Sequence, residues 1–291
     1  MPQLNEIMDK RRLSENTVRM EVYSPLVANK ARPGQFVILR VHPRGERIPL
    51  TIADHNRERG TITLFFQEVG KSTLMLGQLE AGDALKDLVG PLGHPTPIQN
   101  YGTAIVVAGG LGTAEMYPIA RALKEAGNHV ITIVGARRRD LLIMLEEMQS
   151  VSDELIITTD DGSFGRQGVV TDPLKELVAA GRADFVICCG PVIMMKFVAA
   201  ATRAAGVPTY ASLNPIMVDA TGMCGACRVS VGGKTYFACV DGPDFNAHEV
   251  DFEELMMRQK AFVQFEQCAL ERWLKEHPEV AAAHPELAPR K

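Results

Sequence analysis

Two cysteines separated by two residues, Cys224 and Cys227, are the side chains of this sequence with the most recognisable chemistry. Two thiolates at this spacing can hold one metal centre from a tight turn, and Gly222 and Gly225 supply the backbone freedom that such a turn requires. A third cysteine, Cys239, follows twelve residues after Cys227. The segment therefore predicts a metal-binding loop with three cysteine ligands.

Residues 228–238 are expected to bring the third cysteine back to the first two. β-forming residues alternate along this segment on both sides of Gly232-Gly233, which is a two-residue turn signal. A hairpin with this turn would place Cys239 beside Cys227.

The fourth ligand is predicted to be Asp219. Plant-type 2Fe-2S ferredoxins use the spacing C-x4-C-x2-C with a distant fourth cysteine, and Asp219 occupies the first position of that spacing here. A carboxylate can bind iron in place of a thiolate. The predicted centre is therefore a 2Fe-2S cluster with the ligands Asp219, Cys224, Cys227 and Cys239.

A zinc site is the main alternative, since the three cysteines and His248 would make a common Cys3His set. Zinc sites built in two parts usually pair one CxxC with a second pair of close ligands, whereas Cys239 stands alone. Three buried free cysteines are a further alternative, but a CxxC flanked by glycines packs poorly in a core. Iron-sulfur ligation is favoured over both.

Length, charge and cysteine use limit the class of protein. The 291 residues suffice for two domains with separate cores, and a net charge of -4 with a pI near 6.0 gives no basic surface for nucleic acid or anionic membranes. No apolar run reaches the roughly 18 residues of a membrane span, and residues 1–6 lack a signal pattern, so a cytoplasmic location is expected. The six cysteines then indicate metal or redox use, with Cys188 and Cys268 expected to be structural.

Residues 1–99 predict a small β-barrel, because they contain β-forming runs separated by turns. The runs are 18–22, 35–41 and 61–66. After Tyr101 the pattern changes to strands that alternate with helices, which predicts a parallel, doubly wound α/β sheet over residues 100–212. The expected strands are 104–108, 129–134, 154–158 and 184–188, and the expected helices are 114–126, 173–180 and one after Pro191.

The remaining residues divide into a cluster segment, 213–250, and a C-terminal region, 251–291. Residues 251–275 predict one amphipathic helix. The residues after it contain two His-Pro-Glu words, which should break a helix, and they are expected to fray.

A glycine-rich turn follows the first strand of the α/β region, where a strand meets a helix. Backbone amides and a helix N-terminus at such a point can bind a pyrophosphate. The candidate nucleotide-binding residues in this turn are Gly109, Gly110, Gly112 and Thr113.

Three further loops are expected at the carboxyl ends of strands, where ligands of open α/β sheets bind. Arg137-Arg138-Arg139 follows the second strand of the α/β region, where the usual dinucleotide-binding pattern has an acidic residue that binds the ribose hydroxyls. The arginines could bind a 2'-phosphate or could begin a solvated helix, and both interpretations stay open. The other two loops, Asp160-Asp161-Gly162-Ser163 and Cys189-Gly190-Pro191, would complete a nucleotide cleft.

Several short sequence motifs, spread over nearly the whole chain, together resemble those of the ferredoxin-reductase superfamily of flavoproteins. Within it the chain is similar to the electron-transfer subunits of dihydroorotate dehydrogenase and, more closely, to the small subunits of NADH-dependent ferredoxin:NADP oxidoreductase, also described as sulfide dehydrogenase. The motifs are Pro33-Gly34-Gln35-Phe36, Arg47-Ile48-Pro49-Leu50-Thr51, Gly109 to Thr113, Asp161-Gly162-Ser163, Cys189-Gly190-Pro191 and the cluster segment ending at Pro243.

The resemblance implies FAD as a cofactor and suggests a role for each matching residue. Arg47 would hold a flavin phosphate and Thr51 would reach flavin N5, since a guanidinium suits phosphate and a hydroxyl can donate without adding charge. Pro49 and Leu50 would pack near the isoalloxazine. The word Gly70-Lys71-Ser72-Thr73 resembles a second flavin phosphate loop. Cys189, followed by Gly190 and Pro191, would face the nicotinamide, and Asp161 would lie in the coenzyme cleft.

The implied activity is the transfer of electrons between NAD(H), FAD and a 2Fe-2S cluster, with NADP(H) not excluded because of the arginine run. Asp219 favours the ferredoxin:NADP oxidoreductase branch, in which an aspartate ligand is expected and which can bifurcate electrons. The electrons need an exit, so a larger flavin and iron-sulfur partner subunit is expected, with ferredoxin reached through it. Two alternatives are an NADH-linked subunit of dihydroorotate dehydrogenase or a hydrogenase, and a flavin and iron-sulfur redox sensor without turnover.

Overall fold

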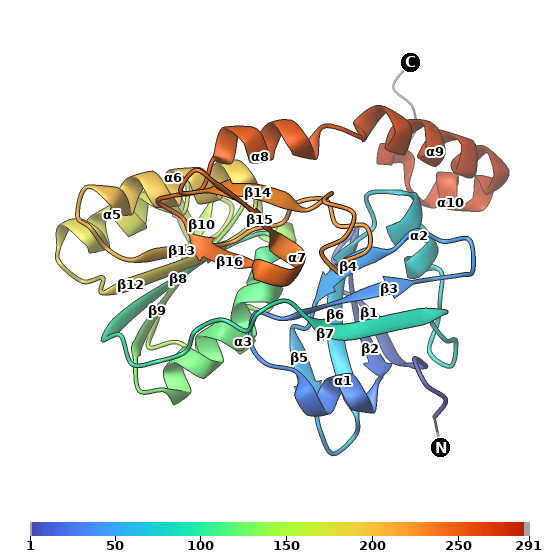
Figure 1. Cartoon of the computed structure of the whole chain (residues 1–291), viewed down its shortest axis with the longest axis horizontal. Helices are drawn as coiled ribbons and strands as arrows, with labels where there is room; N and C mark the ends of the chain where they lie inside the picture. Colours follow the sequence, from blue (N-terminus) through green and yellow to red (C-terminus); the bar gives the residue numbers. More distant parts are fainter. Residues whose placement is uncertain (1, 288–291) are drawn as a thin grey trace.

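The computed structural model describes residues 2–287 and contains the expected antiparallel barrel in its first part (Figure 1). One sheet has the strand order β1-β2-β6-β5, and the other has the order β4-β3-β7. The strands are β1 (Ile7–Arg12), β2 (Thr17–Tyr23), β3 (Phe36–Arg40), β4 (Ile48–Thr51), β5 (Asp54–Asn56), β6 (Thr61–Gln67) and β7 (Asp87–Leu92), and the helices are α1 (Pro25–Lys30) and α2 (Lys71–Gly77).

Apolar side chains at every second position of the barrel strands form the barrel core. Val18, Met20 and Val22 of β2 are buried, and each lies opposite a buried residue of β6, namely Phe66, Leu64 and Ile62. Since side chains two apart share one face of a strand, these three pairs form one apolar layer. The predicted barrel is confirmed.

The second part is a seven-stranded sheet with the order β11-β10-β9-β8-β12-β13-β16, parallel except for the antiparallel pair β13 and β16. The order reverses between β8 and β12, which confirms the predicted doubly wound sheet and creates a switch point at the carboxyl ends of these two strands. The strands are β8 (Thr103–Gly109), β9 (His129–Ala136), β10 (Glu154–Thr159), β11 (Arg166–Gln167), β12 (Phe185–Cys189), β13 (Thr209–Ser212) and β16 (Asp244–Asn246). The helices are α3 (Gly112–Glu125), η1 (Arg139–Leu141), α4 (Leu145–Ser150), α5 (Thr171–Ala179) and α6 (Val192–Arg203).

Between β13 and β16 the chain forms the predicted hairpin, β14 (Arg228–Val231) with β15 (Lys234–Phe237), followed by the short helix α7 (Ala238–Asp241). Gly232 and Gly233 lie between the paired residues Val231 and Lys234, and both have positive φ. That conformation is the one that a tight two-residue hairpin requires of its two central residues.

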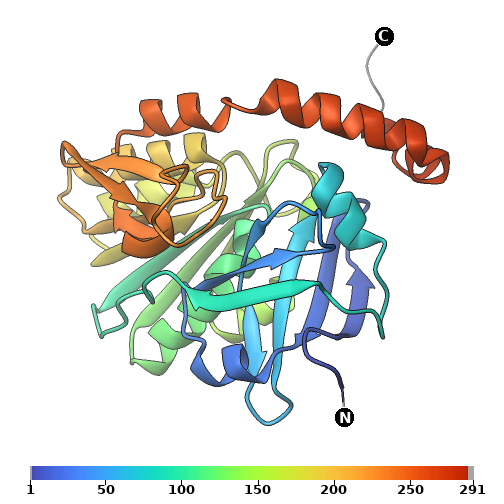
Figure 2. The same cartoon turned by 45° about the vertical axis from the view of Figure 1, so that its right-hand side comes forward.

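The C-terminal region differs from the prediction. Residues 251–275 form two helices, α8 (Phe252–Gln259) and α9 (Val263–Glu276), and the tail continues into α10 (Pro278–Ala283) and η2 (Pro285–Leu287) (Figures 1 and 2). The expectation of a single helix was wrong because α8 packs on the α/β sheet domain while α9 packs on α2 of the barrel. The expected fraying was also wrong within the described residues, because Pro278 begins a helix at a position where proline is favoured.

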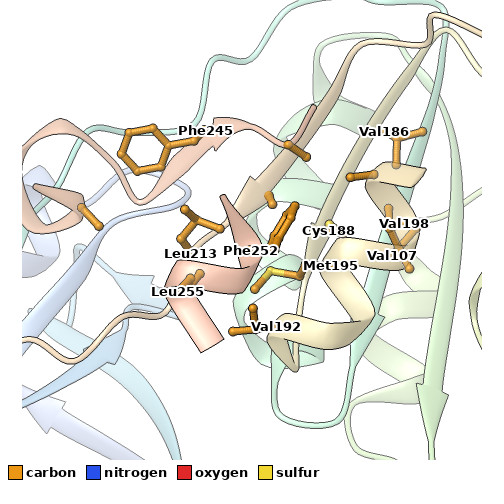
Figure 3. Close-up of a cluster of buried hydrophobic side chains, with 14 of the residues drawn as sticks. Val107, Val186, Cys188, Val192, Met195, Val198, Leu213, Phe245, Phe252 and Leu255 are labelled. Carbon is orange, nitrogen blue, oxygen red and sulfur yellow. The ribbon is translucent and has the colours of Figure 1, made fainter. Parts of the chain in front are cut away.

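Figure 3 shows why α8 stays on the sheet domain. Phe252 and Leu255 of α8 point toward Val192 and Met195 of α6, over the buried Cys188 of β12. Cys188 is therefore a core residue, as the sequence predicted, and the exposed Cys268 lies on α9. Within residues 2–287 no helix combines the length and the apolar character needed to cross a bilayer.

Candidate functional site

A cleft lies between the barrel and the switch point of the sheet. Its barrel wall includes Pro49, Leu50 and Thr51 of β4, together with Phe36, which pairs with Thr51 across the β3–β4 ladder. Its other walls come from the first turn of α3 and from residues 212–217, which follow β13. The residues expected beside an isoalloxazine thus line one apolar cleft. Cys189 and Gly190, expected near a nicotinamide, lie outside its lining and contact it through Glu115 and Asn214.

The two segments expected to hold flavin phosphates, 47–51 and 70–73, lie next to each other. The Ser72 hydroxyl donates to the carboxylate of Glu46, whose neighbour Arg47 is exposed. The Thr73 hydroxyl accepts the backbone amide of Gly70 at 3.2 Å and so caps α2. Arg47 and Lys71, one from each segment, are cations that could bind a phosphate here.

The glycine turn after β8 packs directly against the loop after β12. A Cβ on Gly112 would collide with the carbonyl oxygen of Cys189, and Gly110 has a φ of +56°. The hydroxyl of Thr113 is buried and donates to the Gly110 carbonyl oxygen at 2.9 Å. The amides of Gly110 and Thr113 are used within the protein, since they donate to the carbonyl oxygens of Gly135 at 2.9 Å and of Gly110 at 3.2 Å. The turn brings the two loops of the switch point together.

The arginine run lies beside the acidic loop, as its position in the sequence suggested. Arg138 pairs with Asp140 at 2.9 Å, and the Arg139 guanidinium lies 5.2 Å from the centre of the Phe164 ring. The Arg139 amide donates to the Ser163 hydroxyl oxygen at 2.9 Å. All three arginines are exposed, and Arg139 begins the short helix η1.

Asp161 forms the turn of the acidic loop. Its carboxylate accepts the backbone amide of Ser163 at 2.9 Å, and hydrogen bonds from Ser163 lower the pKa of Asp161. The side chain is exposed in the loop that follows β10 and does not line the cleft.

Cys189 contacts a carboxyl group that the sequence analysis missed. Its thiol donates to Oε2 of Glu115 at 2.6 Å, and burial, followed by the nearby Glu115 charge, raises the pKa of Cys189 well above the ordinary value. The only sequence signal was an acidic residue in the first turn of the helix after the glycine turn. Asn214 was also missed; it lines the cleft and donates to the Gly190 carbonyl oxygen at 3.3 Å.

The four predicted cluster ligands lie in two pairs. The Cys224 sulfur lies 3.2 Å from Oδ1 of Asp219, and the Cys227 and Cys239 sulfurs lie 3.2 Å apart. The predicted return of Cys239 to Cys227 is confirmed. Burial, then the contact with Cys227, raises the pKa of Cys239 to about 12, so a metal must displace a proton from this thiol.

This arrangement fits a binuclear cluster better than a single zinc ion. A 2Fe-2S cluster has two irons, and each pair can supply the two protein ligands of one iron. Within the described residues no group of three or more histidine, cysteine or acidic side chains is gathered around one point. His248 is engaged elsewhere, with its Nε2 2.9 Å from the Thr202 hydroxyl, so the zinc alternative loses its fourth ligand.

The end of α8 connects the ligand loop to the cleft. Arg258 donates to the carbonyl oxygen of Ala226, between two of the ligand cysteines, at 3.1 Å. The next residue, Gln259, donates to the carbonyl oxygen of Asn214 at 2.9 Å. The same helix turn therefore holds both the ligand loop and the residue that contacts Gly190.

Comparisons with protein families agree with this division of the chain. Residues 214–251 match the iron-sulfur cluster binding domain of dihydroorotate dehydrogenase B, and residues 106–200 match the oxidoreductase NAD-binding domain. The first range contains the four predicted cluster ligands, and the second contains the glycine turn, Asp161 and Cys189.

Relatives match over nearly the full length. A dihydroorotate dehydrogenase B (NAD(+)) electron transfer subunit homolog of Thermotoga maritima is 50% identical, over 94% of this chain and 96% of the relative. The electron transfer subunit of Geobacillus thermodenitrificans is 33% identical, over 84% of this chain and 96% of the relative.

Among solved structures, a chain from a study of flavin-based electron bifurcation by NADH-dependent reduced ferredoxin-NADP oxidoreductase superposes with a TM-score of 0.89. It is 49% identical and covers 94% of this chain and 99% of its own length. A ferredoxin NADP+ reductase from Neisseria gonorrhoeae, 15% identical with a TM-score of 0.55, covers 69% of this chain and 90% of its own, and shares the fold. The chain therefore belongs to the family of dihydroorotate dehydrogenase B electron transfer subunits and their homologues, and it is an oxidoreductase subunit with an NAD-binding domain and an iron-sulfur domain.

Proposed function

We propose that this subunit carries electrons between NAD(H) and a larger partner subunit by way of FAD and a 2Fe-2S cluster. When bound, FAD would accept a hydride and release electrons singly, which connects the two-electron nicotinamide to the one-electron cluster. The similarity to the ferredoxin-NADP oxidoreductase chain supports placement in a complex of that kind, in which the larger subunit reacts with ferredoxin and bifurcation takes place. NAD(H) is the proposed coenzyme.

The observation that carries this proposal is the continuity between the cleft and the ligand loop. Met217 lines the cleft and Asp219, two residues later, belongs to the first ligand pair. A cofactor in the cleft and a cluster on the loop would be separated by a very short stretch of protein. That arrangement suits electron transfer better than it suits two independent binding sites.

In the barrel, Arg47 and the loop Gly70-Lys71-Ser72-Thr73 would hold the flavin phosphates, chiefly through the two cations and backbone amides. Pro49 and Leu50 would pack against the ring system, and the Thr51 hydroxyl would donate to N5.

In the sheet domain, the turn of Gly109, Gly110, Gly112 and Thr113 at the start of α3 would lie against the coenzyme pyrophosphate. Asp161 would lie beside the adenosine half, and Cys189, Gly190 and Pro191 beside the nicotinamide. Asp219 with Cys224 would hold one iron, and Cys227 with Cys239 the other.

The partner subunit would dock around the ligand loop, where apolar side chains are exposed. Met223, within the loop, is 86% exposed, and Val218 and Val240 beside it are also exposed. A second group lies on the end of α8 and the start of α9, and consists of Met257, Phe262, Val263 and Phe265. Exposed apolar side chains next to an electron exit favour a protein interface over bulk water. The cytoplasmic location expected from the sequence stays a prediction.

The test is an anaerobic visible and EPR experiment on the chain loaded with FAD, iron and sulfide. NADH should bleach the flavin absorbance and produce the EPR signal of a reduced 2Fe-2S cluster. Cys227→Ser should lose the cluster signal and keep flavin bleaching, whereas Cys268→Ser, a matched change on α9, should behave as the unmodified chain. A colourless chain that retains stoichiometric zinc, or a flavin that NADH does not bleach, would refute the proposal.

A further inference from the structure

The cleft contains a single ionisable side chain among the described residues that line it, and that side chain is Glu115. The rest of the lining is apolar, apart from three neutral polar residues, Thr51, Ser212 and Asn214. Any proton that the reaction leaves in this cleft has one acidic or basic side chain to go to.

The fold fixes Glu115 in that position. It lies in the first turn of α3, and α3 is held against the β12 loop because Gly112 packs on the Cys189 carbonyl oxygen. The Cys189 thiol then donates to Oε2 of Glu115 at 2.6 Å. The carboxyl group therefore has one defined partner, a thiol, and its position follows from the packing of two adjacent parallel strands, β8 and β12.

The surroundings of Glu115 make its carboxylate a better proton acceptor than an exposed one. Burial raises the pKa of Glu115, the hydrogen bond from Cys189 opposes this rise, and the nearby Asp244 on β16 adds to it. The other titratable groups nearby are the thiols of Cys188 and Cys189 on β12 and the carboxyl group of Asp244, whose pKa values burial also raises. Of these groups only Glu115 lines the cleft.

We propose that Glu115 is the proton-exchange group of the cleft, accepting at its carboxylate the proton that remains when electrons leave for the cluster. This inference rests on the proposed function. A hydride delivered to bound FAD would bring two electrons and one proton, and because only the electrons would pass to the cluster, one proton per turnover would have to be taken up by a group of the chain. The proton forms a bond to a Glu115 carboxylate oxygen and then passes to water. Thr51 can donate a hydrogen bond at N5 but cannot hold an additional proton. Cys189 is a positioning residue that fixes the carboxyl group.

The test separates the two half-reactions of the FAD-loaded and cluster-loaded chain. Glu115→Gln keeps the shape and the contact with Cys189 but cannot exchange a proton, and Glu125→Gln, at the exposed far end of the same helix, is the control. Reduction by NADH should be unchanged in Glu125→Gln, and in Glu115→Gln this step should change far less than reoxidation does. Reoxidation by ferricyanide should slow roughly 100-fold in Glu115→Gln, and its solvent deuterium isotope effect should increase, because direct proton loss to water then limits the rate.

A second readout follows the proton and not the rate. A time-resolved infrared spectrum recorded during reoxidation should contain a transient carboxylic acid band in the unmodified chain and in Glu125→Gln, and Glu115→Gln should lack it. If Glu115→Gln does not fold, the absence of any carboxyl band in the unmodified chain overturns the proposal by itself.

Three results would contradict the role of Glu115 while leaving the proposed function intact: unchanged reoxidation in Glu115→Gln, an unchanged carboxyl band in that variant, or weaker NADH binding as the sole effect. The last would mean that Glu115 binds the nicotinamide carboxamide. Failure of NADH to bleach the flavin of the unmodified chain would instead refute the proposed function.

Discussion

Trp273 should anchor the C-terminal helices to the barrel, and its replacement by alanine gives a prediction with a built-in control. Trp273 is 6% exposed and belongs to a small apolar cluster with Leu274, Val280 and Leu74 of α2. Its ring also stacks on His277 with a centroid distance of 4.4 Å. Phe265, on the same helix, is 73% exposed. The two aromatic side chains therefore differ mainly in burial.

The expected loss of unfolding free energy for Trp273→Ala is about 3 kcal/mol, the lower end of the range for a buried aromatic residue, because the cluster is small and can partly collapse. Phe265→Ala should cost less than about 0.5 kcal/mol, since it is a surface change outside any packed cluster. Because α9 and α10 are held to the barrel by this small cluster, part of the lost free energy can appear as local opening of these two helices. Urea unfolding followed by circular dichroism measures the global part, and hydrogen exchange of the α9 and α10 amides measures the local part.

The same variant connects stability to the cleft. Since α2 begins with the loop proposed to hold flavin phosphates, Trp273→Ala should also weaken FAD binding, which equilibrium dialysis can measure. Equal effects of Trp273→Ala and Phe265→Ala on both stability and hydrogen exchange would refute the reasoning, because burial would then not determine the contribution of this helix.

Three further predictions concern the ligand loop and the cleft. Asp219→Ala should lower iron content and abolish the EPR signal, Asp219→Cys should retain a cluster with an altered spectrum, and Cys268→Ser should change neither. Gly222→Ala should reduce cluster incorporation and lower the unfolding free energy by about 1–2 kcal/mol in chemical denaturation. The reason is that Gly222 has a φ of +80° and that an added Cβ would lie 3.1 Å from Val240. Normal stability and normal iron content would contradict this prediction. The pKa of Glu115 is raised in the folded chain, so the unfolding free energy should fall as the pH rises from the pKa of an exposed glutamate through the folded pKa. Urea titrations at several pH values measure this dependence, and Glu115→Gln should flatten it. The same dependence of unfolding free energy on pH in both proteins would count against the prediction.

The local parts of the fold were predictable from the sequence. The hairpin that returns Cys239 was encoded by alternation and by Gly232-Gly233, both of which act between near neighbours. The glycine turn after β8 was recognisable for the same reason. These features need no knowledge of which strands lie side by side.

The contacts that the sequence did not reveal depend on strand order and on packing between domains. Glu115 and Cys189 are 74 residues apart and meet only because β8 and β12 are adjacent in the sheet. The division of residues 251–275 into two helices was equally hidden, since Lys260-Ala261-Phe262 contains neither proline nor glycine. The helix ends there because its two halves pack on different domains.

That division limits how far the two domains can move apart. Helix α8 packs on α6 of the sheet domain and α9 packs on α2 of the barrel, so residues 260–262 form a short tether between them (Figure 2). From Gln259 to Val263 an extended chain reaches at most about 14 Å. A larger separation would require one helix to leave its domain and expose its apolar face. Coenzyme exchange must therefore proceed through small local displacements at the mouth of the cleft, and a hinge motion of whole domains is restrained.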